Sequence, residues 1–186
     1  EIIPAEIQPP PRTPGSASGV RLRIGTEAVT NWGDAAQLVF AFNEQVLLSR
    51  HRLGALADDA IILIEDKWAS HPDEAVRREW DEAMVELGSR SYRFVHVPLE
   101  EQCLQVMENP RRGKNMFALG VLSWIYSRDP DEVGRQVADK FRKKSQDVID
   151  RNLQLVELGA RWAEEHLDFR IEVPAHSPEQ PMVVMN

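Results

Sequence analysis

The amino-acid sequence predicts an α/β fold, with a mainly parallel sheet in a three-layer α/β/α arrangement and a helical C-terminal part. Between residues 37 and 97, short apolar runs of strand length alternate with stretches of helical spacing, which is typical of parallel strands joined by helical crossovers. Beyond residue 98, stretches of helical spacing follow one another with no predicted strand between them. The 186 residues suffice for one domain that buries about 70% of its extended-chain surface.

Several segments have the composition of strands. In Val20–Gly25, apolar residues alternate with arginines and a glycine, which predicts a strand with one solvated face. Gln37–Phe42 and Ala60–Glu65 are continuous apolar runs rich in branched residues, as strands buried on both faces of a parallel sheet are. Arg93–Val97 is a further strand, and we expect Pro98 to end it because proline has no N–H for the ladder.

Helical spacing follows the second and third of these strands. Asn43–Leu56 and Pro72–Leu87 are the predicted crossover helices, and Pro72 stands at a first-turn position that tolerates proline. Lys114–Tyr126, Asp131–Phe141 and Gln146–His166 are predicted helices with no strand between them. The sheet is therefore expected in the N-terminal half and helix packing in the C-terminal part.

Proline-rich segments lie near both ends of the sequence. Pro4–Gly19 contains too many prolines and glycines for a regular helix, so we predict a loop. Asp168–Asn186 also contains several prolines and is predicted to be an extended tail or linker.

The charge and cysteine content exclude several classes of function. A formal charge of −8 argues against a non-specific nucleic-acid binder, which needs a basic face. The apolar runs fall short of the ~20 residues that a membrane-spanning helix requires. Cys103 is the only cysteine, so the chain alone cannot supply the thiolates of an iron–sulfur cluster. We expect a protein of the reducing cytoplasm.

Common nucleotide-binding and catalytic motifs are missing. No two of the ten glycines stand two residues apart, so there is no G-x-G-x-x-G turn. The five histidines lack metal-ligand spacing, and Ser16 and Ser18 have no G-x-S-x-G elbow. Cys103 lies close to Glu100 and Glu101, whose charge disfavours a thiolate, so we expect a buried or inert thiol.

Basic residues directly precede the most apolar helical run. Arg111, Arg112 and Lys114 surround Gly113, where free backbone N–H groups and the helix dipole would favour an anion. Cations at this end of a helix are unfavourable by ~0.3–1 kcal/mol each unless a negative group joins them. That group is either a bound phosphate or a nearby carboxylate of Glu100, Glu101 or Glu108. The simpler alternative is that the basic residues are only solvated.

Two carboxylates end a predicted buried strand. Glu65 and Asp66 stand where α/β sheets commonly place site residues, but the simpler expectation is that they begin a solvent-facing loop. An enzyme in its own right would need one of them within hydrogen-bond distance of a base such as His96. From the residues alone, a free-standing α/β binding module for an anionic ligand or a protein partner remains an alternative to an enzyme.

Ordered motifs cover most of the chain. Pro4–Gly25 contains a P-A-E-I loop leading into a strand, Gly33–Leu47 (GDAAQLVFAFNEQVL) is a strand-to-helix unit, and Gly113–Tyr126 (GKNMFALGVLSWIY) contains K-N-M-F-A-L-G, followed by the helical Lys140–Gly159. In this order they resemble the γ domain of the 2-oxoacid:acceptor (ferredoxin) oxidoreductases, in the version fused to the α subunit of 2-oxoglutarate:ferredoxin oxidoreductase. The resemblance implies oxidative decarboxylation of a 2-oxoacid to an acyl-CoA, with electrons passed to ferredoxin.

The resemblance also implies cofactors and partners. The holoenzyme would use thiamine diphosphate, Mg, iron–sulfur clusters and coenzyme A, while the family's thiamine and cluster residues have no matching positions here. We therefore expect no catalytic or metal-binding residue in this chain, no activity from it in isolation, and packing against other α-subunit domains and the β subunit. The resemblance further implies a cofactor-binding set that meets the coenzyme A phosphates: Arg111, Arg112, Lys114 and Asn115.

The sequence departs from the family pattern at both ends. The first strand and glycine-rich G-x-G-G-x-G turn are absent, and the tail EQPMVVMN resembles the point where the fused subunit continues. We expect residues 1–166 to form the γ-type domain and residues 167–186 to be an extended linker to an absent following domain.

Overall fold

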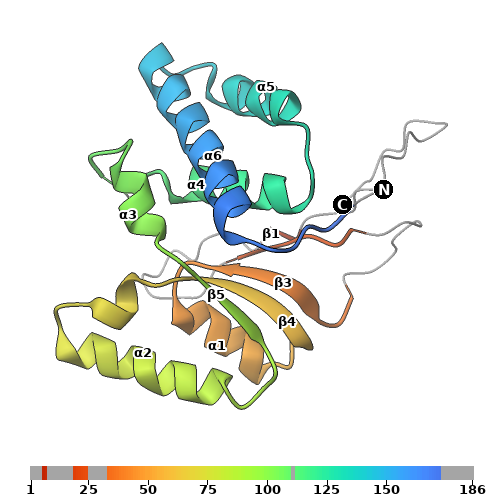
Figure 1. The fold of residues 1–186 in the computed structure, drawn as a ribbon, viewed down its shortest axis with the longest axis vertical. Coiled ribbons are helices and arrows are strands. Elements are labelled where there is room, and N and C mark those ends of the chain that lie inside the picture. The colour runs from red at the N-terminus through yellow and green to blue at the C-terminus, as the bar shows by residue number, and fades with distance from the viewer. Residues whose placement is uncertain (1–5, 8–18, 25–32, 110–111, 173–186) are drawn as a thin grey trace. The chain divides into compact units, whose positions relative to one another are not determined.

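The computed structural model describes residues 6–7, 19–24, 33–109 and 112–172, and the chain divides into two compact units (Figure 1). The N-terminal unit includes the chain up to Val97, and the helical unit is Pro98–Glu172. Most of the predicted loop Pro4–Gly19 and the whole tail beyond residue 172 lie outside the described residues. The loop prediction is wrong at Glu6–Ile7, which forms a short strand. The predicted domain boundary at residue 166 stays a prediction.

A parallel sheet organises the N-terminal unit. Its strands β3 (Ala36–Ala41), β4 (Leu56–Glu65) and β5 (Arg93–Val97) lie in the order β3-β4-β5. Leu63 of β4 stands opposite Phe40 of β3 and Val95 of β5. Because the strands run the same way, their carboxyl ends share one edge of the sheet. The α/β class, the parallel sheet and the helical C-terminal part predicted from the sequence are confirmed.

Two crossover helices cover one face of this sheet (Figure 1). They are α1 (Glu44–Arg52) and α2 (Glu74–Leu87), the second preceded by the short 3₁₀ helix η1 (Lys67–Ser70). Asn43 caps α1, since its side-chain Oδ1 accepts a hydrogen bond from Val46 N at 3.1 Å. The buried apolar core joins strands and helices and consists of Ala41, Leu47, Leu48, Leu56, Ala60, Ile62, Ile64, Trp80, Ala83 and Leu87.

The first predicted strand is shorter than expected, and its apolar side chains face solvent. β2 (Val20–Arg21) pairs antiparallel with β1 (Glu6–Ile7) in a separate two-stranded sheet. The apolar residues of the alternation are the exposed ones, with Val20 64% and Leu22 61% exposed. Arg21 is half-buried, and its Nη2 donates to the carbonyl of Gly33 at 2.6 Å. The arginine therefore occupies the side that the alternation assigned to apolar residues, because it finds a backbone acceptor there.

The helical unit contains α3 (Leu99–Leu104), α4 (Lys114–Ile125), α5 (Pro130–Phe141) and α6 (Gln146–His166). The last three lie within a residue of the predicted helices at each end. α3 was not predicted, because a helix of six residues is too short to show a helical period in the sequence.

α4 and α6 cross at a pair of glycines. A Cβ atom on Gly120 would overlap the backbone carbonyl of Val156, and one on Gly159 would overlap the backbone carbonyl of Phe117. The obstacle is backbone on both sides, so it cannot move away as a side chain could. Only residues without a side chain permit this close approach.

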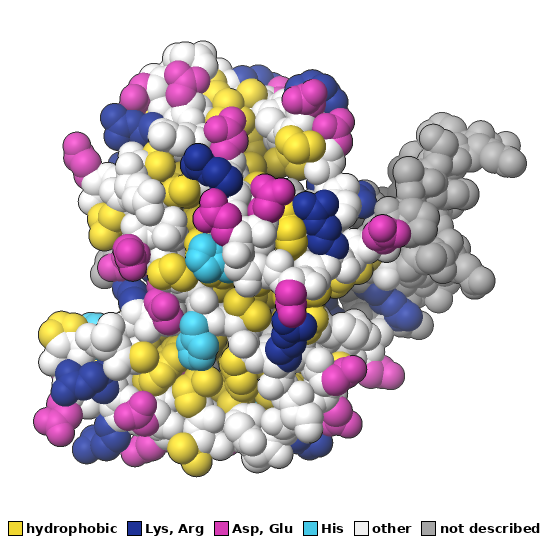
Figure 2. Space-filling view, viewed as in Figure 1, with side chains coloured by type: hydrophobic (Ala, Val, Ile, Leu, Met, Phe, Trp, Pro, Cys, Tyr) yellow, Lys and Arg dark blue, Asp and Glu magenta, His cyan; other side chains and the backbone are white. Residues whose placement is uncertain are grey.

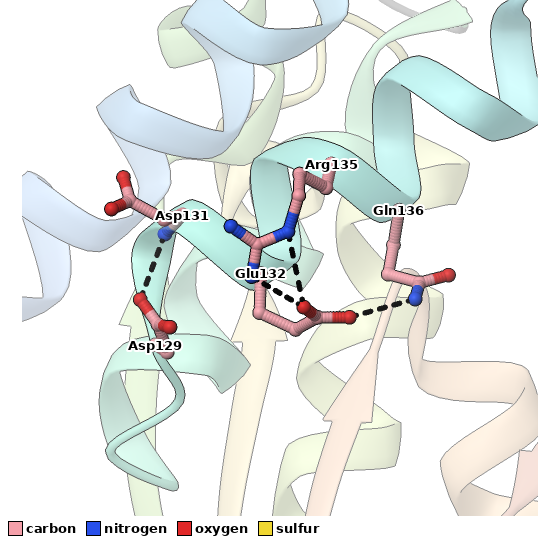
Figure 3. A network of polar contacts seen from close by, with 5 residues as sticks. All are labelled: Asp129, Asp131, Glu132, Arg135 and Gln136. Atoms are coloured by element: carbon pink, nitrogen blue, oxygen red, sulfur yellow. Dashed lines mark hydrogen bonds and ion pairs between the residues drawn. The ribbon is translucent and has the colours of Figure 1, made fainter.

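The start of α5 carries a local polar network (Figure 3). Asp129 caps the helix by accepting a hydrogen bond from Asp131 N at 3.0 Å. Gln136 Nε2 donates to Glu132 Oε1 at 2.8 Å, and Arg135 Nη2 donates to Glu132 Oε2 at 2.6 Å. The hydrogen bond from Gln136 and those from Arg135 lower the pKa of Glu132 below its ordinary value of 4.5.

The chain after α6 packs along α4. Leu167 is buried, and Ile171 N donates to the carbonyl of Ile125 at 2.7 Å. The guanidinium of Arg170 lies 4.2 Å from the centre of the Trp124 ring, a cation–π arrangement. These contacts attach the segment up to residue 172 to the helical unit.

Candidate functional site

The predicted basic cluster lies at the start of α4. Gly113 is the N-cap of this helix and carries no side chain to cap it. A Cβ atom there would lie 2.7 Å from Leu155 Cδ1, so the close approach of α6 favours glycine. Arg112 N, just before the helix begins, donates to the carbonyl of Asn109 at 3.2 Å.

Lys114 has an internal partner. Its Nζ donates to Glu100 Oε2 at 3.1 Å, and the side chains of Lys114 and Glu100 are only 13% and 31% exposed. Glu100 belongs to α3, so the ion pair joins α3 to α4. This carboxylate is one of those that the sequence offered as compensation for a cation at the positive end of the helix dipole.

The other predicted phosphate contacts that the structure describes are exposed to solvent. Arg112 and Asn115 are both exposed at the helix start, while Arg111 lies outside the described residues. The structure thus brings Arg112, Lys114 and Asn115 to one helix end but directs the ammonium group of Lys114 toward Glu100. Among the described members, Arg112 is the exposed cation.

The carboxyl edge of the parallel sheet holds buried carboxylates. Glu65, at the end of β4, is 0% exposed, so the expectation that it begins a solvent-facing loop is wrong. Its strand extends through residue 65, where it pairs with Val97. Asp66, the next residue, is half-buried and its N donates to the carbonyl of Val97 at 3.2 Å.

Glu44 is a buried residue that the sequence reasoning missed. It is 7% exposed in the first turn of α1, where the helix dipole favours a carboxylate. Its Oε1 accepts from Gln45 Nε2 at 3.3 Å, and its Oε2 has no hydrogen-bond partner in the described part of the chain. Its place directly after a predicted strand and a capping Asn43 could have pointed to it.

The cysteine, a histidine and two aromatic residues that the sequence contains lie outside the two sites above. Cys103 is fully buried, as predicted. His96 is exposed on β5, and its ring stands 6.5 Å from that of Trp80. Trp162 is 5% exposed and belongs to the buried core. Tyr126, at the end of α4, is half-buried, and this burial raises the pKa of its hydroxyl above 10.0.

The metal centres of the implied holoenzyme find no ligand set among the described residues. The single cysteine cannot supply the several thiolates of an iron–sulfur cluster, and no group of three or more His, Cys, Asp or Glu side chains gathers among the described residues. Within the same residues, no helix is long and apolar enough to cross a bilayer.

Comparisons with known proteins agree on one family. Residues 10–162 match the family model described as pyruvate ferredoxin/flavodoxin oxidoreductase. The chain is 26% identical to the 2-oxoglutarate oxidoreductase subunit KorA of Mycobacterium tuberculosis, over 92% of this chain and 27% of that protein.

A solved structure shows the same fold. It is the 2-oxoglutarate:ferredoxin oxidoreductase from Magnetococcus marinus with 2-oxoglutarate, coenzyme A and succinyl-CoA bound. Its TM-score is 0.61 at 21% identity, covering 84% of this chain and 25% of that one. The chain thus spans about a quarter of the length of these relatives. Because the family model covers most of its residues, the chain belongs to the pyruvate ferredoxin/flavodoxin oxidoreductase family, as a γ-type domain.

Proposed function

We propose that this chain is an accessory domain of a 2-oxoacid:ferredoxin oxidoreductase of the 2-oxoglutarate type. Such an enzyme decarboxylates the 2-oxoacid, transfers the acyl group to coenzyme A and passes the electrons to ferredoxin. The match of residues 10–162 to the family carries this proposal. Similarity to KorA over nearly the whole chain supports the 2-oxoglutarate type.

The proposed contribution of the domain is assembly and closure on the coenzyme A side of the active site. One cysteine is too few for a cluster, so the clusters, and the thiamine diphosphate with its Mg, would be held by the other α-subunit domains and the β subunit. The chain by itself is expected to be inactive.

The start of α4 is the proposed contact with the phosphates of coenzyme A. Arg112 and Asn115 are exposed there, and Arg111 immediately precedes them in the sequence. A guanidinium binds phosphate oxygens through charge-assisted hydrogen bonds. Lys114 belongs to the same cluster but contributes through its ion pair with Glu100, which sets the position of the helix start.

Co-purification tests the assignment to the enzyme. The tagged natural protein should retain brown companion chains that carry iron–sulfur clusters, and the complex should reduce ferredoxin when 2-oxoglutarate and coenzyme A are supplied. Loss of this activity when the chain is removed, and its return when the chain is added back, would support the accessory role. A colourless protein without companions would instead favour a free-standing binding module.

A kinetic comparison tests the phosphate contact. Replacing Arg111 and Arg112 together by Gln should raise the KM for coenzyme A about tenfold or more, since each charge-assisted hydrogen bond contributes roughly 1.5–3 kcal/mol. The KM for the 2-oxoacid should not change, and the effect should shrink as salt rises. Arg142→Gln is the control, because Arg142 is an exposed arginine of another helix end that pairs with Asp139. An unchanged KM for coenzyme A would refute the contact.

A further inference from the structure

An open cavity of about 300 Å³ lies at the surface of the helical unit, between α3 and the C-terminal half of α6, and four of its seven lining residues are exposed. Its size is at the lower end of the ~300–1,000 Å³ typical of small-molecule sites. The lining combines two amide side chains, one from α3 and one from its C-cap, with a single stripe of α6 side chains: Gln102, Gln105, Leu158, Arg161, Trp162, Glu165 and His166.

The aromatic wall of the cavity is fixed in place. Trp162 is 5% exposed, and the His166 ring stacks on it at 4.8 Å with 9° between the planes. His166 Nδ1 lies 2.8 Å from the carbonyl of Trp162. A carbonyl only accepts, so Nδ1 carries the proton, and in the neutral ring Nε2 remains as an acceptor.

Opposite charges stand one helical turn apart in the lining without pairing. Arg161 and Glu165 form no ion pair with any described residue. Similarly spaced pairs elsewhere in the unit do close, as Arg151 with Asp147 at 3.0 Å shows. A guanidinium and a carboxylate are therefore both available at this cavity.

The two glutamines add one hydrogen-bond donor and one hydrogen-bond acceptor to the lining. Gln105 Nε2 donates to Gln102 Oε1 at 2.9 Å, which leaves the amide N–H groups of Gln102 as donors and Gln105 Oε1 as an acceptor. Leu158, which is half-buried, and the small exposed part of the Trp162 ring supply the apolar surface beside them. The lining thus offers positive, negative and apolar groups within one small volume.

We propose that this cavity binds a free α-amino acid with an apolar side chain. Its carboxylate meets Arg161 and the amide of Gln102, its ammonium group meets Glu165 and Gln105 Oε1, and its side chain packs on Leu158 and Trp162. A ligand with only one charged group would pair with Arg161 or with Glu165 and leave the other without a partner. This inference is independent of the proposed oxidoreductase function and concerns a different part of the helical unit from the start of α4.

Calorimetric titration of the full natural protein with three matched probes tests it. L-leucine carries both charged groups, 4-methylpentanoate lacks the amine, and 3-methylbutylamine lacks the carboxylate. Leucine should bind, and each single-charge probe should bind about tenfold or more weakly, because a charge-assisted hydrogen bond is lost in each case. No detectable leucine binding, or equal binding of 4-methylpentanoate, overturns the proposal.

Variants place the binding in the cavity. Glu165→Gln and Arg161→Gln should each weaken leucine binding about tenfold, whereas Glu164→Gln, a change at the adjacent exposed residue outside the lining, should leave it unchanged. All three sites are exposed, so unaltered thermal unfolding is expected and confirms the fold of each variant. Equal effects of Glu164→Gln and Glu165→Gln overturn the proposal, as does a structure of the full assembly in which a neighbouring polypeptide fills the cavity.

Discussion

Gly120 of α4 and Gly159 of α6 face one another's helix backbones, so that a methyl group at either position would overlap a carbonyl of the opposite helix. These two helices form the largest element-to-element contact of the helical unit. The contact therefore depends on the absence of two side chains as much as on the apolar residues around it.

Gly120→Ala is expected to destabilise the protein by about 3 kcal/mol or more, because overpacking against a backbone forces the helices apart. Urea unfolding followed by circular dichroism measures the change. Gly134→Ala on α5 is the matched control, since its nearest neighbour, Leu153 Cδ2, lies 3.9 Å away. The control should be neutral or stabilising by up to ~1 kcal/mol through helix propensity. Similar losses in both variants would contradict the close crossing.

Lys114→Met is expected to cost roughly 1–3 kcal/mol, because it leaves the half-buried carboxylate of Glu100 without this partner. The same substitution removes the ion pair that joins α3 to α4. A double-mutant cycle with Glu100→Gln measures the coupling between the two side chains. Additive effects of the two substitutions would show that the ion pair does not join the helices in solution.

Asn43→Ala is expected to cost about 1 kcal/mol, since the side-chain cap of α1 would be lost. Ser145→Ala offers a comparison at the start of α6, where the side chain makes no capping hydrogen bond. The serine variant should lose clearly less stability in the same denaturant titration. A larger loss at Ser145 than at Asn43 would be inconsistent with the capping geometry described.

Glu132 gives the stability a defined acid dependence. Its pKa is lower in the folded chain than its ordinary value of 4.5, so the folded state favours the carboxylate. The stabilisation is therefore complete above pH 4.5 and is lost as the pH falls through the lowered native pKa. Glu132→Gln should reduce the slope of stability against pH in this acid window.

The measurement is a series of urea unfolding curves at decreasing pH. Glu157→Gln serves as the control, because Glu157 is exposed and makes no hydrogen bond or ion pair with another described residue. The expected difference is small, since the network around Glu132 is solvent-exposed and screened by salt. An identical pH slope in wild type and Glu132→Gln would contradict the shift.

Local patterns predicted most of the fold. β5 matches its predicted range, and the start and end of α6 were predicted from its apolar stripe. The predictions failed where burial depends on residues far away in the sequence. The alternation that begins at Val20 does not show which face of the strand will be buried. The burial of Glu65 depends on its neighbouring strand β5.

The candidate site was less accessible to sequence reasoning for the same reason. The basic cluster at Lys114 was visible, but its pairing with Glu100 was only one of several compensations that the sequence allowed. The cavity between α3 and α6 was not predicted, because α3 itself was not. Sites formed between elements need the packing of those elements, which composition and periodicity do not supply.

Cys103 is a natural probe of local opening in the helical unit. It is the only thiol in the printed sequence and is 0% exposed, so a maleimide or aromatic disulfide reagent can modify it only after α3 opens. The rate of labelling under native conditions then gives the free energy of that local opening without any engineered probe.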